Sequence, residues 1–194
     1  MNKTINTLRL NLAKRILSDS ISDESLRNHF FDDPQTLSES EIIDALKKPV
    51  LYGSLVGNFY PQRAHTMIGL RRLDNLQFCI EDVLENNVKG DFIEAGVWRG
   101  GASIFMKLLL KEYGMNDRTV FVADSFEGLP KPDPKFPVDA NDEHHLVDFL
   151  KVSVEEVQNN FKKYNVLDNN VNFLKGWFKD TLKDPPFESL SILR

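Results

Sequence analysis

The spacing of apolar and polar positions changes repeatedly along the chain, and these changes predict alternating helices and strands. Apolar side chains recur every three or four residues in several stretches, which predicts helices over 5–17, 67–87, 102–113 and 153–164. Short apolar runs bounded by turn residues predict strands at 91–95, 119–123, 171–174 and 190–193. Strands separated by helices are typical of a parallel sheet, so we expect an α/β fold with about four parallel strands.

The residues before the sheet predict a helical segment of their own. Three short helices are expected, over 5–17, 23–31 and 39–48. Ser38 and Glu41 have the spacing of a capping box at the start of the third helix. We therefore expect an N-terminal helical cap or oligomerisation segment at 1–63, which covers the ligand crevice of an α/β domain at 64–194.

The sequence also predicts a loop before the first long helix of the α/β domain and a role for the apolar stripe of the first helix. Residues 49–63 are expected to form a loop with aromatic content, and Thr66 is expected to cap the helix that follows. The helix over 5–17 has its apolar side chains on one stripe. That stripe suits docking on a partner or a membrane surface, but packing within its own domain or on a second subunit is favoured.

A glycine-rich turn follows the first predicted strand and opens the next helix. Gly96, Gly100 and Gly101 are spaced Gly-x-x-x-Gly-Gly, which differs from both the dinucleotide fingerprint and the P-loop. Glycines let the backbone turn sharply and approach a ligand, and a helix start presents free N–H groups. The turn is either a ligand cradle or a plain tight turn.

Asp124 follows the second predicted strand and favours the cradle. An acidic residue at this place can accept hydrogen bonds from ribose hydroxyls. The alternative is an aspartate that only initiates the turn Asp-Ser-Phe-Glu-Gly. The ribose interpretation is preferred because of its spacing from the glycine turn.

The proline-rich stretch at 125–143 predicts a long loop beside the crevice. We interpret it as a lid, with an ordered surface loop as the alternative. His144 and His145 are the only adjacent pair of potential bases near it, and a solvated loop position is preferred to a catalytic role for either. Trp177 and Phe178 either flank a flat ring or pack in the core.

Composition limits the function further. The 194 residues carry a net charge of −5, which does not indicate a nucleic-acid surface. The sequence shows no apolar run of membrane-spanning length and no apolar stretch typical of a signal peptide. The single cysteine, Cys79, cannot form an internal disulfide and is interpreted as a core residue. We therefore expect a cytoplasmic protein without nucleic-acid or membrane partners.

Long motifs resemble the macrocin O-methyltransferase (TylF) family. The matching stretches lie at 66–70, 72–76, 90–101, 124–130, 174–178 and 180–182. The resemblance implies a Rossmann-like class I methyltransferase sheet and an enzyme that uses S-adenosylmethionine. It also implies a small-molecule acceptor, a hydroxyl of a sugar or natural product, and a possible homo-oligomer.

The resemblance also implies a set of cofactor-binding residues. The glycine turn with Glu94 and Ser103 would hold the methionine part, Asp124 and Ser125 the ribose, and Gly176 and Trp177 the adenine. Tyr60, Thr66 and Met67 would lie near the reacting end. These assignments agree with the analysis of the residues themselves at Glu94, the glycines and Asp124.

The chain departs from the family pattern at its end. In the family, acidic residues that bind a divalent metal such as Mg²⁺ follow the position of Arg194, so we expect a truncated chain that does not bind the metal. The competing hypothesis is a catalytically inactive remnant, or a cofactor-binding or interaction module that needs a second chain. A nicotinamide-dependent dehydrogenase is a weaker third hypothesis, against which the glycine spacing argues.

Overall fold

A four-stranded parallel sheet forms the centre of the computed structural model, which describes residues 3–57 and 62–194. The strands are β1 (Asp91–Ala95), β2 (Val120–Asp124), β3 (Val171–Lys175) and β4 (Leu190–Leu193), in the order β3-β2-β1-β4. Every pair is parallel. The α/β class and the four parallel strands are therefore confirmed. Ala95 pairs with Ala123, and Ala123 with Leu174, so three strands end at the same edge.

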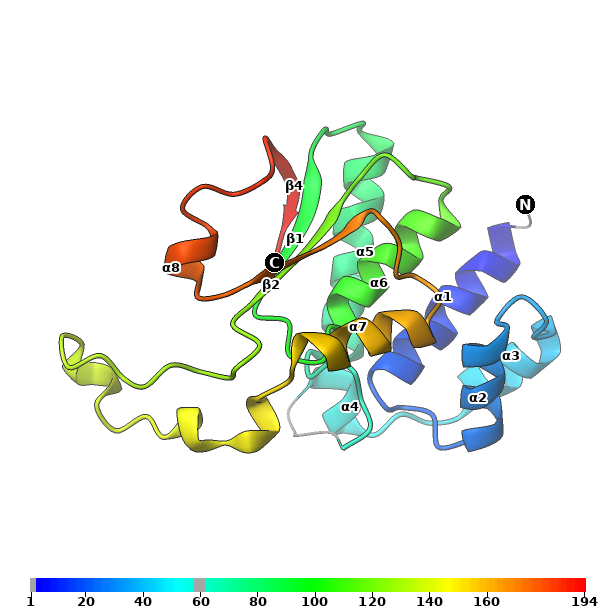
Figure 1. The fold of residues 1–194 in the computed structure, drawn as a ribbon. Coiled ribbons are helices and arrows are strands. Elements are labelled where there is room, and N and C mark those ends of the chain that lie inside the picture. The colour runs from blue at the N-terminus through cyan, green and yellow to red at the C-terminus, as the bar shows by residue number, and fades with distance from the viewer. Residues whose placement is uncertain (1–2, 58–61) are drawn as a thin grey trace.

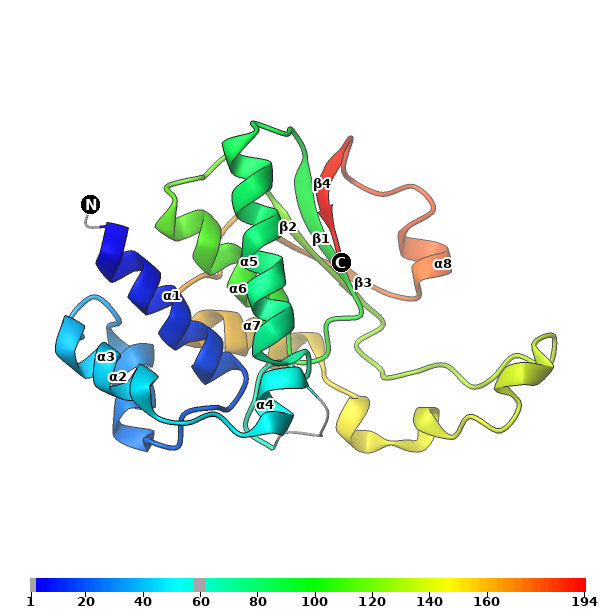
Figure 2. The ribbon, with the colours of Figure 1, turned by 180° about the vertical axis from the view of Figure 1, so that it is seen from behind.

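Helices α5 (Gly69–Glu85), α6 (Gly101–Glu112) and α7 (Val154–Lys163) lie on one face of this sheet (Figures 1 and 2). Helix α1 (Lys3–Leu17) packs on α5 and α6 on the side away from the strands. Helix α6 packs on β1 and β2, and its buried side chains include Ile104, Phe105 and Leu109. The opposite face carries a smaller cluster around Ile93 and Phe121, which α8 (Phe178–Thr181) and the segment after it cover.

The N-terminal helices pack behind α5 and α6. Helices α2 (Glu24–Asp32) and α3 (Glu39–Lys47) join α1 in the main apolar core, and α1 contacts α3, α5 and α6. Leu12 and Ile16 are fully buried, so the apolar stripe of α1 packs within its own chain, as the sequence favours. The capping box of Ser38 and Glu41 is present.

Three local details differ from the sequence-based predictions. The predicted loop at 49–63 contains a helix, α4 (Tyr52–Val56), and the single-turn helix α8 was also not predicted. Thr66 does not cap α5, because the residue at the N-cap is Ile68. A Cβ atom at Gly69 would lie 2.4 Å from the backbone nitrogen of Gly57, at the end of α4. This backbone crossing fixes where α5 begins, which short-range sequence rules do not capture.

His65 joins three helices at the base of the glycine-rich turn. Its backbone N–H donates to the carbonyl of Leu17 (2.9 Å), and its carbonyl accepts from Gly101 N–H (2.8 Å). Its ring Nδ1 is hydrogen-bonded to the hydroxyl of Tyr164 at 2.9 Å. Burial, with smaller contributions from the positive charges of Lys163 and Arg27, lowers the pKa of His65 to about 3.

This buried histidine predicts a loss of stability in mild acid. The unfolded chain protonates His65 near pH 6.5 and the folded chain only near 3, so its contribution is complete above pH 6.5 and falls below it. Each pH unit between these values should cost up to about 1.4 kcal/mol. Urea unfolding at pH 7.5, 6 and 5 measures this slope. The slope should be smaller in His65→Gln, and equal slopes in both proteins would contradict the assignment.

Candidate functional site

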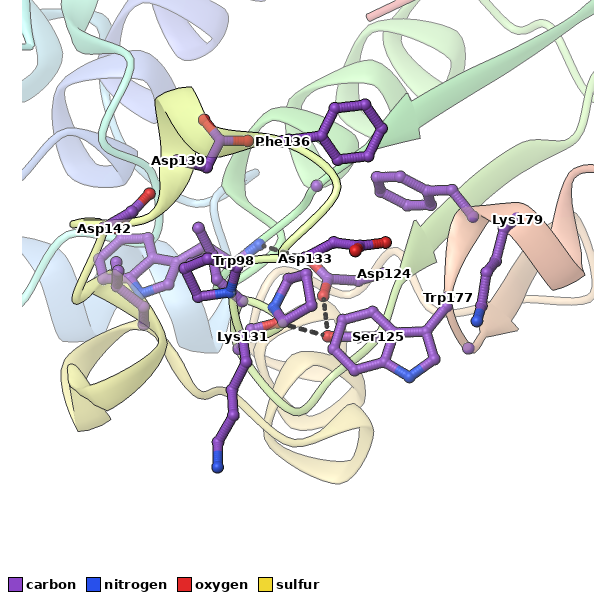
Figure 3. A pocket seen from close by; sticks show the side chains of 18 of the residues that line it. Trp98, Asp124, Ser125, Lys131, Asp133, Phe136, Asp139, Asp142, Trp177 and Lys179 are labelled. Carbon is purple, nitrogen blue, oxygen red and sulfur yellow. Dashed lines mark hydrogen bonds between the residues drawn. The ribbon is translucent and has the colours of Figure 1, made fainter.

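A cavity of about 950 Å³ opens at the carboxyl ends of the strands (Figure 3). Gly96 follows β1, Asp124 and Ser125 lie at the end of β2, and Gly176 and Trp177 follow β3, and all five line the cavity. In open α/β sheets, ligands bind outside the carboxyl ends of the strands. The cavity therefore lies where the fold places a ligand site.

The three glycines of the turn have different surroundings. A Cβ atom at Gly96 would meet no described atom within 4 Å, and its φ is +85°, so the backbone is open to the cavity there. Gly100 and Gly101 instead face protein. A Cβ atom would lie 2.7 Å from a methyl of Val157 at Gly100, and 2.4 Å from the carbonyl of His65 at Gly101. Of the three, Gly96 borders the ligand space, and the others allow α6 to pack closely.

Asp124 holds two turns together. Its Oδ2 accepts from the backbone N–H of Val97 (2.8 Å) and Trp98 (3.4 Å) in the glycine turn. Its Oδ1 accepts from the N–H of Phe126 (2.9 Å) and from the Ser125 hydroxyl (3.3 Å). The turn-initiating contact that the sequence offered as an alternative is thus present. Asp124 also lines the cavity.

Glu94 supports the turn from behind. It is 2% exposed, and its Oε2 accepts from both the backbone N–H (2.8 Å) and the hydroxyl (2.5 Å) of Ser103 in the first turn of α6. The Arg194 guanidinium pairs with its other oxygen. Burial raises the pKa of Glu94, and the charge of Arg194 and the bonds from Ser103 oppose this rise. Within the described chain, neither Glu94 nor Ser103 lines the cavity.

The remaining expected site residues divide between the cavity and its surroundings. Met67 lines the cavity, whereas Thr66 is buried and absent from the described wall. Tyr60 lies outside the described residues. His144 and His145 lie on a short 3₁₀ turn, and neither belongs to the described wall. The His144 ring is hydrogen-bonded to Asp142.

No described residue before Met67 belongs to the cavity wall. The apolar side chains of the described N-terminal helices join the core behind α6. That the segment at 1–63 forms a cap over the crevice stays a prediction.

Much of the other wall was not predicted from the sequence. It comes from the segment after β2, together with Trp98 in the glycine turn and Lys179 on α8 (Figure 3). The segment contributes an apolar and an acidic series of side chains, among them Leu129, Phe136, Leu150, Asp133, Asp139 and Asp142. Prolines indicated a loop here, but no periodicity identifies which loop side chains turn inward.

Two features are absent from the described residues. Among the described residues, no group of three or more histidine, cysteine or acidic side chains could hold a metal ion. In the same part of the chain, no helix is long and apolar enough to cross a membrane.

The geometry at Asp124 predicts a large effect of its removal. Asp124→Ala leaves the N–H groups of Val97 and Phe126 without their acceptor, which should reduce the free energy of unfolding by about 2 kcal/mol. Glu127→Ala, three residues along and exposed, is the matched control and should change it by less than about 0.5 kcal/mol. Chemical denaturation measures both. Equal free energies of unfolding for Asp124→Ala and the wild-type chain would show that the carboxylate does not hold the turns.

The chain has close relatives among known proteins. The model of the macrocin-O-methyltransferase (TylF) family matches residues 5–194. Mycinamicin III 3''-O-methyltransferase of Micromonospora griseorubida is 53% identical over 143 residues, which are 71% of this chain and 56% of that protein. Demethyldecarbamoylnovobiocin O-methyltransferase of Streptomyces niveus is 40% identical over 195 residues, 97% of this chain and 68% of that protein.

A solved structure agrees with these relatives. The O-methyltransferase NovP superposes with a TM-score of 0.78 at 39% identity, over 97% of this chain and 71% of that one. The chain thus spans between about half and three quarters of the length of the proteins it matches. The chain belongs to the macrocin-O-methyltransferase (TylF) family.

Proposed function

We propose that this chain binds S-adenosylmethionine in the cavity and serves the transfer of its methyl group to a hydroxyl of a sugar or other small natural product. One observation carries the proposal. The turns after β1, β2 and β3 converge on one cavity, with open space over Gly96, in a chain of this family. The names of the relatives support the acceptor class, because they are O-methyltransferases of mycinamicin III and of demethyldecarbamoylnovobiocin.

The residues of the cavity fit this cofactor. Open space over Gly96 lets a ligand lie against the backbone, where a side chain would fill the room. The Asp124 carboxylate lines the wall and suits ribose hydroxyls. The Trp177 ring beside it offers an apolar face to a flat base (Figure 3). We assign the methionine part to Gly96, the ribose to Asp124 and Ser125, and the adenine to Gly176 and Trp177.

Methyl transfer from this cofactor depends more on the positioning of the acceptor than on acid–base groups. When bound, the cofactor supplies a methyl carbon that is already electrophilic. The chain then has to align the acceptor oxygen with that carbon and exclude water. Phe136 and Leu129 give the acceptor an apolar wall, and Met67 lies on the wall as well. Asp133, Asp139 and Asp142 give hydrogen-bond acceptors for sugar hydroxyls on the same segment.

The proposal assigns no step to a metal. The family resemblance implies Mg²⁺, but the described residues offer no metal-binding group. The cytoplasmic location expected from the sequence also remains part of the proposal. The alternative function is a cofactor-binding module that requires a second chain for transfer.

A homo-oligomer is a further element of the proposal. Leu51 and Tyr52, at the start of α4, are 80% and 72% exposed, which suits a contact between copies. Light scattering coupled to gel filtration should give a mass above that of one chain, and Leu51→Asp with Tyr52→Asp should lower it. A monomeric wild-type mass would contradict this element alone.

Cofactor binding is tested by two glycine variants. Gly96→Ala and Gly114→Ala both place a Cβ atom at a positive φ in open space, so both should lose about 1–2 kcal/mol of stability. Gly114 ends α6 away from the cavity. In calorimetric titration with S-adenosylhomocysteine, Gly96→Ala should bind at least tenfold more weakly than wild type, and Gly114→Ala should bind as wild type does.

The outcomes separate the hypotheses. A folded wild-type chain that binds neither S-adenosylhomocysteine nor S-adenosylmethionine would contradict the proposed function. Binding without transfer of labelled methyl to a panel of glycosides, with Mg²⁺ present, would favour the module that requires a second chain. Tighter binding of a nicotinamide dinucleotide would favour a dehydrogenase-type site.

A further inference from the structure

A long arm leaves the sheet and returns to it beside the cavity. We define the arm as residues 127–151, all of which the structure describes and none of which is buried. It runs between the buried residues Phe126 and Val152, and extends away from the body of the molecule in Figure 1. Its ends meet, because a Cβ atom at Gly128 would lie 2.7 Å from the Lys151 side chain. The arm is thus a loop that is closed at its base.

Trp98 provides one of those contacts from inside the glycine turn. Its indole Nε1–H donates to the backbone carbonyl of Phe149 at 2.9 Å, and the two rings lie 5.2 Å apart. Trp98 is 9% exposed, and its backbone N–H also points to Asp124. One residue therefore contacts the cradle through its backbone and the returning arm through its side chain.

Arg99 extends this contact to the segment that precedes Met67. Its guanidinium carbon lies 4.4 Å from the centre of the Trp98 ring and 5.2 Å from that of Phe149. The same group donates to the carbonyls of Gln62 (2.8 Å) and Ala64 (3.0 Å), just before Met67 of the cavity wall. A planar guanidinium can stack on aromatic rings and donate in its plane at the same time, which a lysine cannot do.

The backbone at Trp98 has an unfavourable conformation. Its φ is +50°, in the left-handed region that large side chains rarely occupy. Residues keep such angles only where surrounding contacts hold them, and they concentrate at functional sites. The indole hydrogen bond, the ring contact and the guanidinium supply such contacts here.

We propose that Trp98 and Arg99 are positioning residues that form an aromatic clamp with Phe149. The clamp fixes the returning end of the arm against the glycine turn, and so keeps the arm in a fixed position relative to the cofactor cradle. The part of this inference that concerns the cofactor rests on the proposed function. Variants of Arg99 distinguish a positioning role from direct contact with the ligand, since within the described chain the cavity wall includes Trp98 but not Arg99.

Hydrogen exchange of the ligand-free chain tests the clamp directly. The amides of Leu150 and Lys151 donate to the carbonyls of Val147 and Asp148 at the returning end. Peptides covering 144–152 should exchange at least fivefold faster in Arg99→Ala and in Trp98→Phe, which keeps a ring but loses the indole donor. Val138→Ala, at a position that is 97% exposed on the same arm, is the control and should exchange as wild type does.

Calorimetric titration with S-adenosylhomocysteine tests the link to the cradle. Arg99→Ala should bind about tenfold more weakly at a temperature where the variant remains fully folded. Arg99→Lys keeps the charge that faces Glu156 but not the stacking, so it should not restore affinity.

The outcomes are distinct. Unchanged exchange at 144–152 in both clamp variants would overturn the clamp, and unchanged affinity in Arg99→Ala would overturn its positioning role. Full recovery in Arg99→Lys would overturn the stacking argument. A wild-type chain that binds no cofactor would contradict the proposed function alone, and the exchange result would still decide the clamp.

Discussion

The carboxylate of Asp124 connects the two turns on which the candidate site depends. It accepts from backbone N–H groups of Val97 in the glycine turn and of Phe126 after β2. Parallel strands bring these turns side by side at one edge of the sheet, and the backbone ladder ends with a bond from Gly96 N–H to the carbonyl of Ala123 (2.9 Å). Beyond that bond, the charged acceptor shared by both turns connects them, and charge-assisted bonds are stronger than neutral ones. The relative position of the two turns in the cavity wall therefore depends on this carboxylate.

Close packing behind the turn supports the same geometry. Gly101 lies against the carbonyl of His65, and Glu94 accepts two hydrogen bonds from Ser103 at the start of α6. A side chain at Gly101, or a larger residue in place of Ser103, would push α6 away from β1. The two sides of the glycine turn therefore have different surroundings. One side is closed by the protein, and the other is open to a ligand at Gly96.

The sequence predicted the sheet and most helices because both leave periodic traces in the order of apolar residues. It placed Gly96 and Asp124 together for the same reason, since the carboxyl ends of parallel strands share an edge. It missed α4, α8 and the start of α5, which depend on a backbone crossing at Gly69 and on turns too short to show a period. It also missed Trp98, because a ring that reaches 51 residues along the chain leaves no local pattern.

The central claim is that this cavity is a cofactor site built from the ends of three strands. A crystal structure of the chain with S-adenosylhomocysteine tests it most directly. The account predicts density for the amino-acid part over Gly96, the ribose beside Asp124 and the adenine against Trp177. Ligand density at another place on the molecule, or a cavity that stays empty at saturating ligand, would contradict it.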